Sequence, residues 1–196
     1  PKHTIVADMK TIDVGGPEVE IAAKSGADIV VVLGVSSDPT ITEAILSARQ
    51  YGAKVMVDLF NVDDKTARAK EVEKMGADYI CVHVGVDEQM VGGSPISELK
   101  GLAKAVDIPI AAAGGINSET APEIVRAGVS IVIVGGAIIK AKDVAGAARK
   151  VKRSITTGKK VKTELFKKYS EKELFQAFSK VSSPNVTDAQ HKKGAM

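Results

Sequence analysis

The sequence predicts an α/β fold of the (β/α)8 TIM-barrel class, in which parallel strands alternate with helices. Three observations lead to this prediction. A pattern of helix end, glycine and apolar strand recurs along the chain, the strands are unbroken apolar runs, and two neighbouring strands each end in a pair of glycines. Strands and helices that alternate with right-handed crossovers build a parallel sheet, which either stays open or closes into a barrel.

The recurring pattern covers residues 24–32, 74–82 and 126–134, at spacings of 50 and 52 residues. Each copy predicts a helix that ends near a basic residue, a glycine that stops it, and then a buried strand. Because the strands are continuous apolar runs rather than alternating ones, both faces of the sheet should be covered. Together with the three repeats, strands are predicted at 4–8, 54–58 and 108–113, which makes six.

Helices are predicted between the strands from residues that favour helix N-termini. Polar side chains such as Asp and Ser accept hydrogen bonds from the first free N–H groups, and Pro is favoured in the first turn. The predicted helices are 39–51 after Asp38, 64–75 after Asp63, 95–105 after Ser94, 119–127 after Ser118 and 144–154 after Asp143.

The glycine pairs favour a barrel over a doubly wound open sheet, which is the alternative. Gly114 and Gly115 follow one predicted strand, and Gly135 and Gly136 follow the next. Two such loops can present backbone N–H groups to one anion, and in (β/α)8 barrels the loops after strands 7 and 8 bind phosphate. Counting back makes 4–8 the third strand, so we expect this chain to lack strands 1 and 2. If the glycines only form tight turns, this argument fails.

Composition places the protein among ordinary globular chains. It has 196 residues, of which 44% are hydrophobic and 26% charged. The single cysteine, Cys81, allows no internal disulfide, and no signal peptide is visible, so we expect a cytoplasmic location. No apolar run approaches the ~18 residues that span a membrane.

Charge is distributed unevenly along the chain. Residues 1–150 carry 16 basic and 20 acidic side chains, whereas residues 151–172 carry eight basic and two acidic ones. The predicted barrel is therefore mildly acidic, and a nucleic-acid surface is not indicated. The basic cluster at 159–168 is expected to be a solvated helix face, with RNA binding as the alternative.

Chemically active residues are expected where strands end, because barrel enzymes place their catalytic groups there. Asp8 and Lys10 are two residues apart, so on an extended backbone they point to one side. Asp58 and His83 end two other predicted strands. A carboxylate could hold a divalent metal, Lys10 could stabilise an enediolate, and His83 could transfer protons. A lysine beside carboxylates stays protonated, which disfavours a Schiff base.

Several motifs together resemble the orotidine 5′-phosphate decarboxylase superfamily over about residues 3–150. They are Asp8-x-Lys10-x-x-Asp13, Val82-His83-x-Gly85-x-Asp87, and the loops Gly114-Gly115 and Gly135-Gly136. Within the superfamily, the segments 7–11, 32–34 and 132–138 are most similar to the 3-hexulose-6-phosphate synthase family. The decarboxylases of 3-keto-L-gulonate 6-phosphate have an Arg where this chain has Gly136, which favours the synthase.

The resemblance implies a (β/α)8 barrel that forms a homodimer with shared active sites. It implies a Mg²⁺-dependent, reversible aldol addition of formaldehyde to D-ribulose 5-phosphate. Carried over by residue, it makes Asp8 a metal ligand, Lys10 a stabiliser of the enediolate, Asp13 a contributor to the partner's site, His83 a proton carrier and Gly114, Gly115, Gly135 and Gly136 phosphate binders. The family's substrate-binding Asp and metal-ligating Glu belong to strands 1 and 2.

Two other functions stay open at this point. One is the related 3-keto-L-gulonate-6-phosphate decarboxylase activity. The other is a non-catalytic phosphate-binding or regulatory module with an incomplete barrel.

Residues 156–196 leave the strand–helix pattern and follow the barrel domain, 1–155. A linker is predicted near 156–160, with amphipathic helices at 163–169 and 171–181. The segment 183–189 resembles the opening of an RraA-like domain, which archaeal proteins fuse behind a hexulose-phosphate synthase. A tail that clasps the partner subunit is the alternative.

Overall fold

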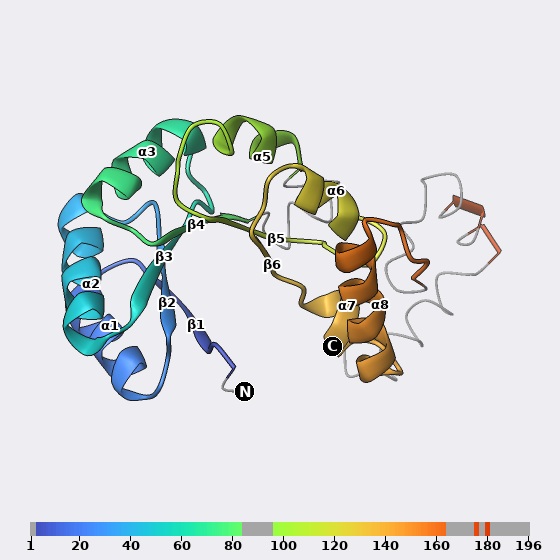
Figure 1. Ribbon diagram of the computed structural model, residues 1–196, viewed down its shortest axis with the longest axis horizontal. Coiled ribbons are helices and arrows are strands. Elements are labelled where there is room, and N and C mark those ends of the chain that lie inside the picture. Colours follow the sequence, from blue (N-terminus) through green and yellow to red (C-terminus); the bar gives the residue numbers. More distant parts are fainter. Residues whose placement is uncertain (1–2, 84–95, 164–174, 177–178, 181–196) are drawn as a thin grey trace. The chain divides into compact units, whose positions relative to one another are not determined.

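A computed structural model describes residues 3–83, 96–163, 175–176 and 179–180 of the chain (Figure 1). The chain divides into two units, Pro1–Thr163 and Glu164–Met196. The helices and strands considered below all belong to the first unit. None of the helices in the described ranges is long and apolar enough to cross a membrane.

Strands and helices alternate through the first unit. The strands are β1 (Val6–Thr11), β2 (Ile29–Leu33), β3 (Lys54–Asp58), β4 (Tyr79–His83), β5 (Ile110–Ala113) and β6 (Ile131–Val132). The helices are α1 (Gly15–Lys24), α2 (Asp38–Tyr51), α3 (Lys65–Met75), α5 (Ile96–Leu102), α6 (Ala121–Arg126), α7 (Gly136–Ile139) and α8 (Val144–Thr157).

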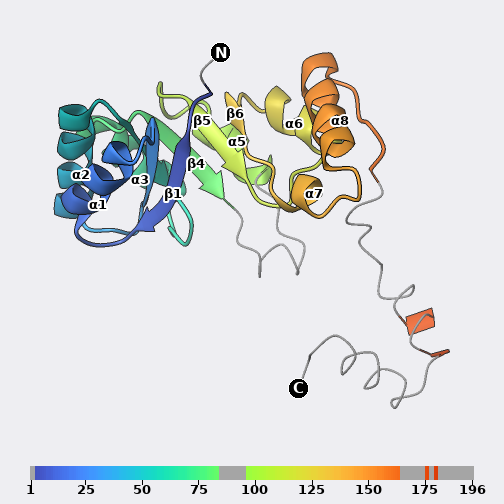
Figure 2. The ribbon, with the colours of Figure 1, turned by 90° about the horizontal axis from the view of Figure 1, so that it is seen from below.

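The order of the strands in the sheet separates the two predicted topologies. All six strands are parallel, and their order in the sheet follows their order in the chain. A doubly wound sheet reverses its order at a switch point, whereas a barrel adds each strand beside the last. The sequential order therefore confirms the barrel class. Figure 1 shows α1, α2, α3 and α5 on the same side of the strands, and Figure 2 shows α7 and α8 near β6.

Strands β2 to β5 bury side chains on both of their faces, as the unbroken apolar runs predict. Strand β1 instead leaves Val6 and Met9 exposed, and β6 is only partly buried. On one face Val30, Val55 and Ile80 pack with helix residues such as Ile41. On the other face a second cluster contains Ile29, Val31, Met56, Cys81, Ala111 and Ala113. Alternate residues of a strand point to opposite faces, so each apolar run supplies side chains both to the helix-covered face and to the barrel interior.

Three helix starts differ from the prediction, two of them by a choice between neighbouring polar residues. Ser37, not Asp38, caps α2, and its Oγ accepts a hydrogen bond from the Thr40 N–H at 3.3 Å. Asp64, not Asp63, caps α3. Ser118 does not cap a helix, because α6 begins later, at Ala121 after Thr120. Its hydroxyl instead donates to the Val161 carbonyl at 2.7 Å. Asp143 caps α8 as predicted, and the helix continues to Thr157.

The repeated pattern has a shared backbone geometry. Gly26, Gly76 and Gly128 have φ values of +101°, +100° and +98°, the left-handed conformation that ends a helix most easily at glycine. In two copies the following Asp binds the start of a neighbouring strand. Asp28 Oδ2 accepts from the Ile5 N–H at 2.8 Å, and Asp78 Oδ2 accepts from the Val55 N–H at 2.9 Å.

Replacing Asp78 with Ala should destabilise the protein by about 1–3 kcal/mol, because the partly buried Val55 N–H loses its acceptor. Urea unfolding should show a lower midpoint with an unchanged slope. Asp63 is exposed, so Asp63→Ala serves as the control and should change stability by less than about 0.5 kcal/mol. Equal midpoints for the two variants would contradict the role of Asp78.

Some predictions lie outside the described residues. These are the helix start at Ser94, the motif residues Gly85 and Asp87, most of the two tail helices and the segment 183–189. They stay predictions.

Candidate active site

The first strand carries an irregularity at the residues that the sequence singled out. In the parallel pairing of β1 with β2, Ala7 lies opposite Val30 and Thr11 lies opposite Val32. Two more residues therefore separate the pairing positions on β1 than on β2. Lys10 takes the left-handed conformation within this bulge, with φ at +50°. Bulges redirect side chains and occur beside active sites.

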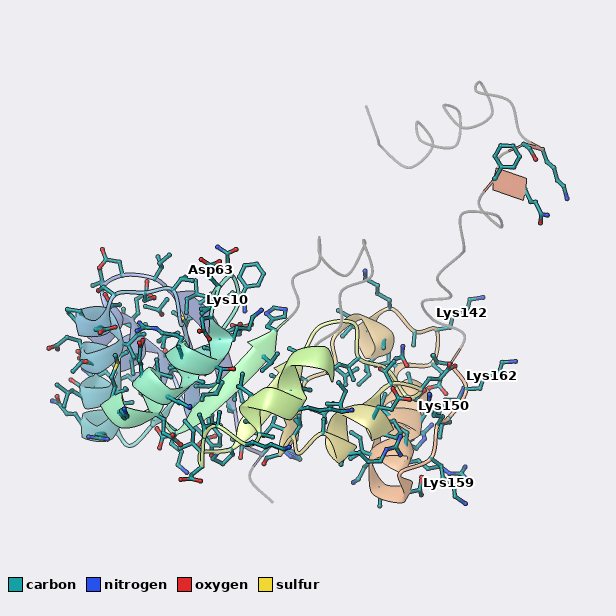
Figure 3. The ribbon with its side chains drawn as sticks, turned by 90° about the horizontal axis from the view of Figure 1, so that it is seen from above. Lys10, Asp63, Lys142, Lys150, Lys159 and Lys162 are labelled. Carbon is teal, nitrogen blue, oxygen red and sulfur yellow. The ribbon has the colours of Figure 1, made fainter. Side chains whose placement is uncertain are left out.

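Lys10 forms two ion pairs at the end of the sheet where the strands stop. Its Nζ lies 3.1 Å from Asp8 Oδ1 and 2.9 Å from Asp58 Oδ2. Figure 3 shows Lys10 at the end of the sheet from which the loop with Asp63 also projects. The pairing of Asp8 with Lys10 is therefore confirmed as a contact, although a bulge and not a regular strand produces it.

The Asp58 carboxylate on β3 connects side chains of two other strands, β1 and β4. Its Oδ2 contacts both Lys10 on β1 and His83 Nδ1 on β4, the latter at 3.2 Å. Its Oδ1 accepts from the Phe60 N–H at 3.0 Å, and the Phe60 ring lies 5.6 Å from the His83 ring. Only 2% of the Asp58 side chain is exposed, so a buried carboxylate connects the two residues expected to act on substrate.

The surroundings stabilise the charged forms of this pair. Burial would raise the pKa of Asp58, but hydrogen bonds and charges from His83 and Lys10 outweigh it and lower that pKa below its usual range. Burial would lower the pKa of Lys10, but Asp58 and Asp8 outweigh it and raise that pKa. The pairing stabilises the fold until pH falls through the lowered pKa of Asp58 or rises through the raised pKa of Lys10. Lys10 is therefore an ammonium at neutral pH.

The contact with Asp58 also selects the tautomer of His83. An ionised carboxylate only accepts hydrogen bonds, so Nδ1 of His83 carries the proton that Asp58 Oδ2 binds. In the neutral ring Nε2 then has a free lone pair. This tautomer suits a group that takes a proton from substrate and later returns it.

Asp13 is not brought to this cluster. It is exposed in the loop between β1 and α1, and its Oδ1 accepts from the Val14 N–H at 2.8 Å. Within the described part of the chain no ion pair joins it to Lys10. Val14 has φ at +54°, which is rare for a β-branched residue and marks a strained loop.

The glycine loops lie at adjacent strand ends, since β5 and β6 pair in parallel. Gly114 and Gly115 have φ values of +103° and +61°, which L side chains adopt only with strain. A Cβ added at Gly135 would meet no atom within 4 Å, so this loop leaves open space above the backbone. Gly136 begins α7, whose first N–H groups have no partner within the helix.

The described residues contain no group of three or more His, Cys, Asp or Glu arranged to hold a metal ion. Asp8 offers one carboxylate, and its side chain is 58% exposed beside Lys10. Mg²⁺ is often bound by one or two carboxylates together with water and substrate oxygens. Asp8 can therefore supply one ligand of such a site, but the described residues do not supply a complete set of ligands.

Charged residues and glycine loops at the carboxyl ends of sequentially ordered parallel strands are the arrangement of a (β/α)8-barrel enzyme. The chain belongs to the orotidine 5′-phosphate decarboxylase / HUMPS family, whose model matches residues 1–151. This family assignment agrees with the resemblance noted in the sequence.

Three proteins of known name are similar to this chain over most of its length. A 3-hexulose-6-phosphate synthase of Bacillus subtilis is 42% identical over 159 residues, which cover 81% of this chain and 76% of the relative. The structure of 3-hexulose-6-phosphate synthase from Salmonella typhimurium aligns with a TM-score of 0.76 and 40% identity, covering 79% of this chain and 74% of that one. The structure of KGPDC from Streptococcus mutans aligns with a TM-score of 0.74 and 26% identity, covering 80% of this chain and 74% of that one.

Proposed function

We infer that this chain is a lyase of the aldolase type with 3-hexulose-6-phosphate synthase activity. In the synthetic direction it would add formaldehyde to D-ribulose 5-phosphate and form D-arabino-hex-3-ulose 6-phosphate. The observation that carries this inference is the identity of about 40% with several synthases over most of the chain. The lower identity of 26% with KGPDC favours the synthase over the decarboxylase.

The cluster of Lys10, Asp58 and His83 can perform the proton transfers of this reaction. The C1–H bond of the sugar breaks, and we assign that proton to Nε2 of His83. The electrons left behind form an enediolate, whose negative charge the Lys10 ammonium stabilises. C1 then bonds to the carbon of formaldehyde, whose oxygen takes the proton back from Nε2 of His83 and becomes a hydroxyl. Asp58 helps to keep Lys10 protonated, and its hydrogen bond to Nδ1 leaves Nε2 of His83 facing outward for proton transfer.

A divalent cation, proposed as Mg²⁺, would be held in part by Asp8. When bound it supplies Lewis-acid polarisation of the sugar carbonyl and the neighbouring hydroxyl. We assign the phosphate of the substrate to the N–H groups at Gly114, Gly115, Gly135 and Gly136. The open space at Gly135 and the adjacency of β5 and β6 support this assignment.

A homodimer with shared sites is the proposed assembly, and the cytoplasm the proposed location. Asp13 is flanked by Ile12 and Val14, two apolar residues that are 61% and 55% exposed. Apolar residues beside an exposed carboxylate suit an interface that carries Asp13 toward a partner's site. The exposed position of Asp13 supports this proposal.

The proposed mechanism predicts that Lys10 forms no Schiff base. Sodium borohydride added with ribulose 5-phosphate in the absence of formaldehyde should leave the mass of the intact protein unchanged, because a protonated amine does not attack the sugar carbonyl. A sugar adduct on Lys10, located by peptide mass spectrometry, would contradict the enediolate mechanism. An aldolase that uses a lysine Schiff base serves as the positive control.

Formaldehyde release from hexulose 6-phosphate tests the function directly. We expect release by the purified protein in the presence of Mg²⁺, its loss with a chelator and its return when Mg²⁺ is added back. Release of CO2 from 3-keto-L-gulonate 6-phosphate at a higher kcat/KM would instead establish the decarboxylase. Thermal stabilisation by ribulose 5-phosphate without turnover of either compound would indicate a binding module.

A further inference from the structure

We propose that Ser36 and Arg68 are positioning residues that hold the Lys10–Asp58 ion pair in its geometry. The kinetic part of this proposal rests on the proposed synthase function. Neither residue contacts the two charged groups directly. They act through the loop of residues 34–37, which connects β2 to α2 and lies between the strands that carry Lys10 and Asp58.

The loop makes one hydrogen bond to the backbone beside each charged residue. Ser36 Oγ donates to the Thr11 carbonyl at 3.0 Å, one residue after the left-handed Lys10. On the other side, the Gly34 N–H donates to the Asp58 carbonyl at 2.7 Å. The same four-residue loop thus links the backbones of β1 and β3, on either side of β2.

The environment of Thr11 shows why this link matters for Lys10. A lysine with positive φ persists only where its surroundings force that conformation. Thr11 and Ser36 are both buried, and the Thr11 hydroxyl donates to Glu18 Oε2 at 2.5 Å. Thr11 is therefore held through both its carbonyl and its side chain, which fixes the chain immediately after Lys10.

Arg68 on α3 in turn holds the loop. Its Nε donates to the Gly34 carbonyl at 2.7 Å and its Nη2 to the Ser36 carbonyl at 2.9 Å. Its Nη1 pairs with Asp38 at 2.7 Å and Glu71 at 2.8 Å. The planar guanidinium can make these bonds together, whereas a lysine ammonium cannot match the same fork. The side chain is largely buried, at 15% exposed.

If Ser36 had only a structural role, its replacement would lower the stability of the protein without a selective loss of kcat. A positioning role predicts that loss of the Ser36 hydroxyl lets the Lys10 ammonium move while the phosphate loops stay unchanged. Misplacement of a catalytic group by about 1 Å can cost about 100-fold in rate. We therefore expect Ser36→Ala to lower kcat by about 10- to 100-fold, with KM for ribulose 5-phosphate within about threefold of wild type.

Ser47→Ala is the matched control. Ser47 Oγ also donates to a distant backbone carbonyl, that of Gly16, at 2.8 Å, but the bond joins α2 to α1 away from the charged cluster. It should lower the melting temperature about as much as Ser36→Ala and leave kcat within about twofold. Equal losses of kcat in the two variants, or an unchanged kcat in Ser36→Ala, would overturn the proposal.

Arg68 gives a second pair of variants in case Ser36→Ala does not fold. Arg68→Lys keeps the positive charge near Asp38 but loses the fork that binds the two carbonyls, so kcat should fall about 10-fold. Asp38→Asn weakens one ion pair and leaves both carbonyl bonds, so kcat should stay within about twofold. The reverse order of effects would show that the charge, and not the loop, is what matters.

Hydrogen exchange provides a readout that does not depend on turnover. Amides of the peptide spanning residues 8–14 should exchange faster in Ser36→Ala than in Ser47→Ala or wild type, while peptides from β5 and α6 should be unchanged. Exchange that rises equally throughout the protein would refute the local role. If the wild-type protein shows no turnover, the proposed function fails, and the exchange comparison still decides the positioning role.

Discussion

Replacing Lys10 with Met should lower kcat for hexulose 6-phosphate by about 100- to 1,000-fold. Its ammonium contacts both Asp8 and Asp58 and would face the developing enediolate, so a neutral thioether cannot replace it. The variant should still fold, because the buried Asp58 carboxylate keeps His83 as a partner. It should be less stable than wild type, because that carboxylate loses the Lys10 cation. Formaldehyde release under saturating substrate, together with circular dichroism, measures both effects.

Lys24→Met is the control for this experiment. Lys24 also pairs with a carboxylate, that of Glu20, but on the exposed surface of α1. Its loss should leave kcat unchanged. Retention of more than about a tenth of wild-type kcat in the Lys10 variant would contradict the assigned role.

The second large effect is expected for Asp58→Asn, which should lower kcat by about 100-fold or more. The amide has nearly the same shape, but it carries no charge and cannot serve both Lys10 and His83 through a single anionic oxygen. His83 loses the group that fixes its Nδ1 proton, so the wrong tautomer becomes populated. Lys10 also loses the partner that chiefly raises its pKa.

Ribulose 5-phosphate should still bind to the Asp58 variant, because the glycine loops do not contact this carboxylate in the described structure. Isothermal titration calorimetry with that sugar phosphate separates binding from chemistry. Asp63→Asn, at the same end of the sheet and exposed, is the matched control. Equal kcat values for the two variants would rule out a catalytic contribution from Asp58.

The sequence predicted the number and order of the strands because their signal is local, although β1 runs over Val6–Thr11 and not over the predicted 4–8, so that Asp8 lies within the strand. Unbroken apolar runs and the left-handed glycines at Gly26, Gly76 and Gly128 place the starts of three strands without knowledge of the rest. The helix starts were harder to place, since Ser37 and Asp38 can both act as N-caps. The backbone path of the loop before α2 determines which of them does. The helix α7 was missed, because its four residues are too short to show a period.

The site was predicted only in part, because the sequence shows contacts between near neighbours and not those between distant residues. Lys10 and Asp8 are close in sequence, so their contact could be inferred, although the bulge that creates it could not. Asp58 was recognised as a strand end but given no role, because its contacts depend on how β1, β3 and β4 approach one another. Its signal was a carboxylate placed directly after a buried strand. Ser36 and Arg68 had no such signal, since a hydroxyl or a guanidinium bound to backbone carbonyls leaves no sequence pattern.

The interior face of the sheet has a consequence for a protein that handles formaldehyde. Formaldehyde alkylates free amines and thiolates, and both Lys10 and the protein's single cysteine belong to strands that form the site. Burial, and then the charge of Asp58, raise the pKa of the Cys81 thiol far above its usual range, so it stays protonated and unreactive. The carboxylates that prepare Lys10 for catalysis likewise keep it from being a nucleophile. The carboxylates proposed to prepare Lys10 for catalysis would thus also protect Lys10 and Cys81 from formaldehyde.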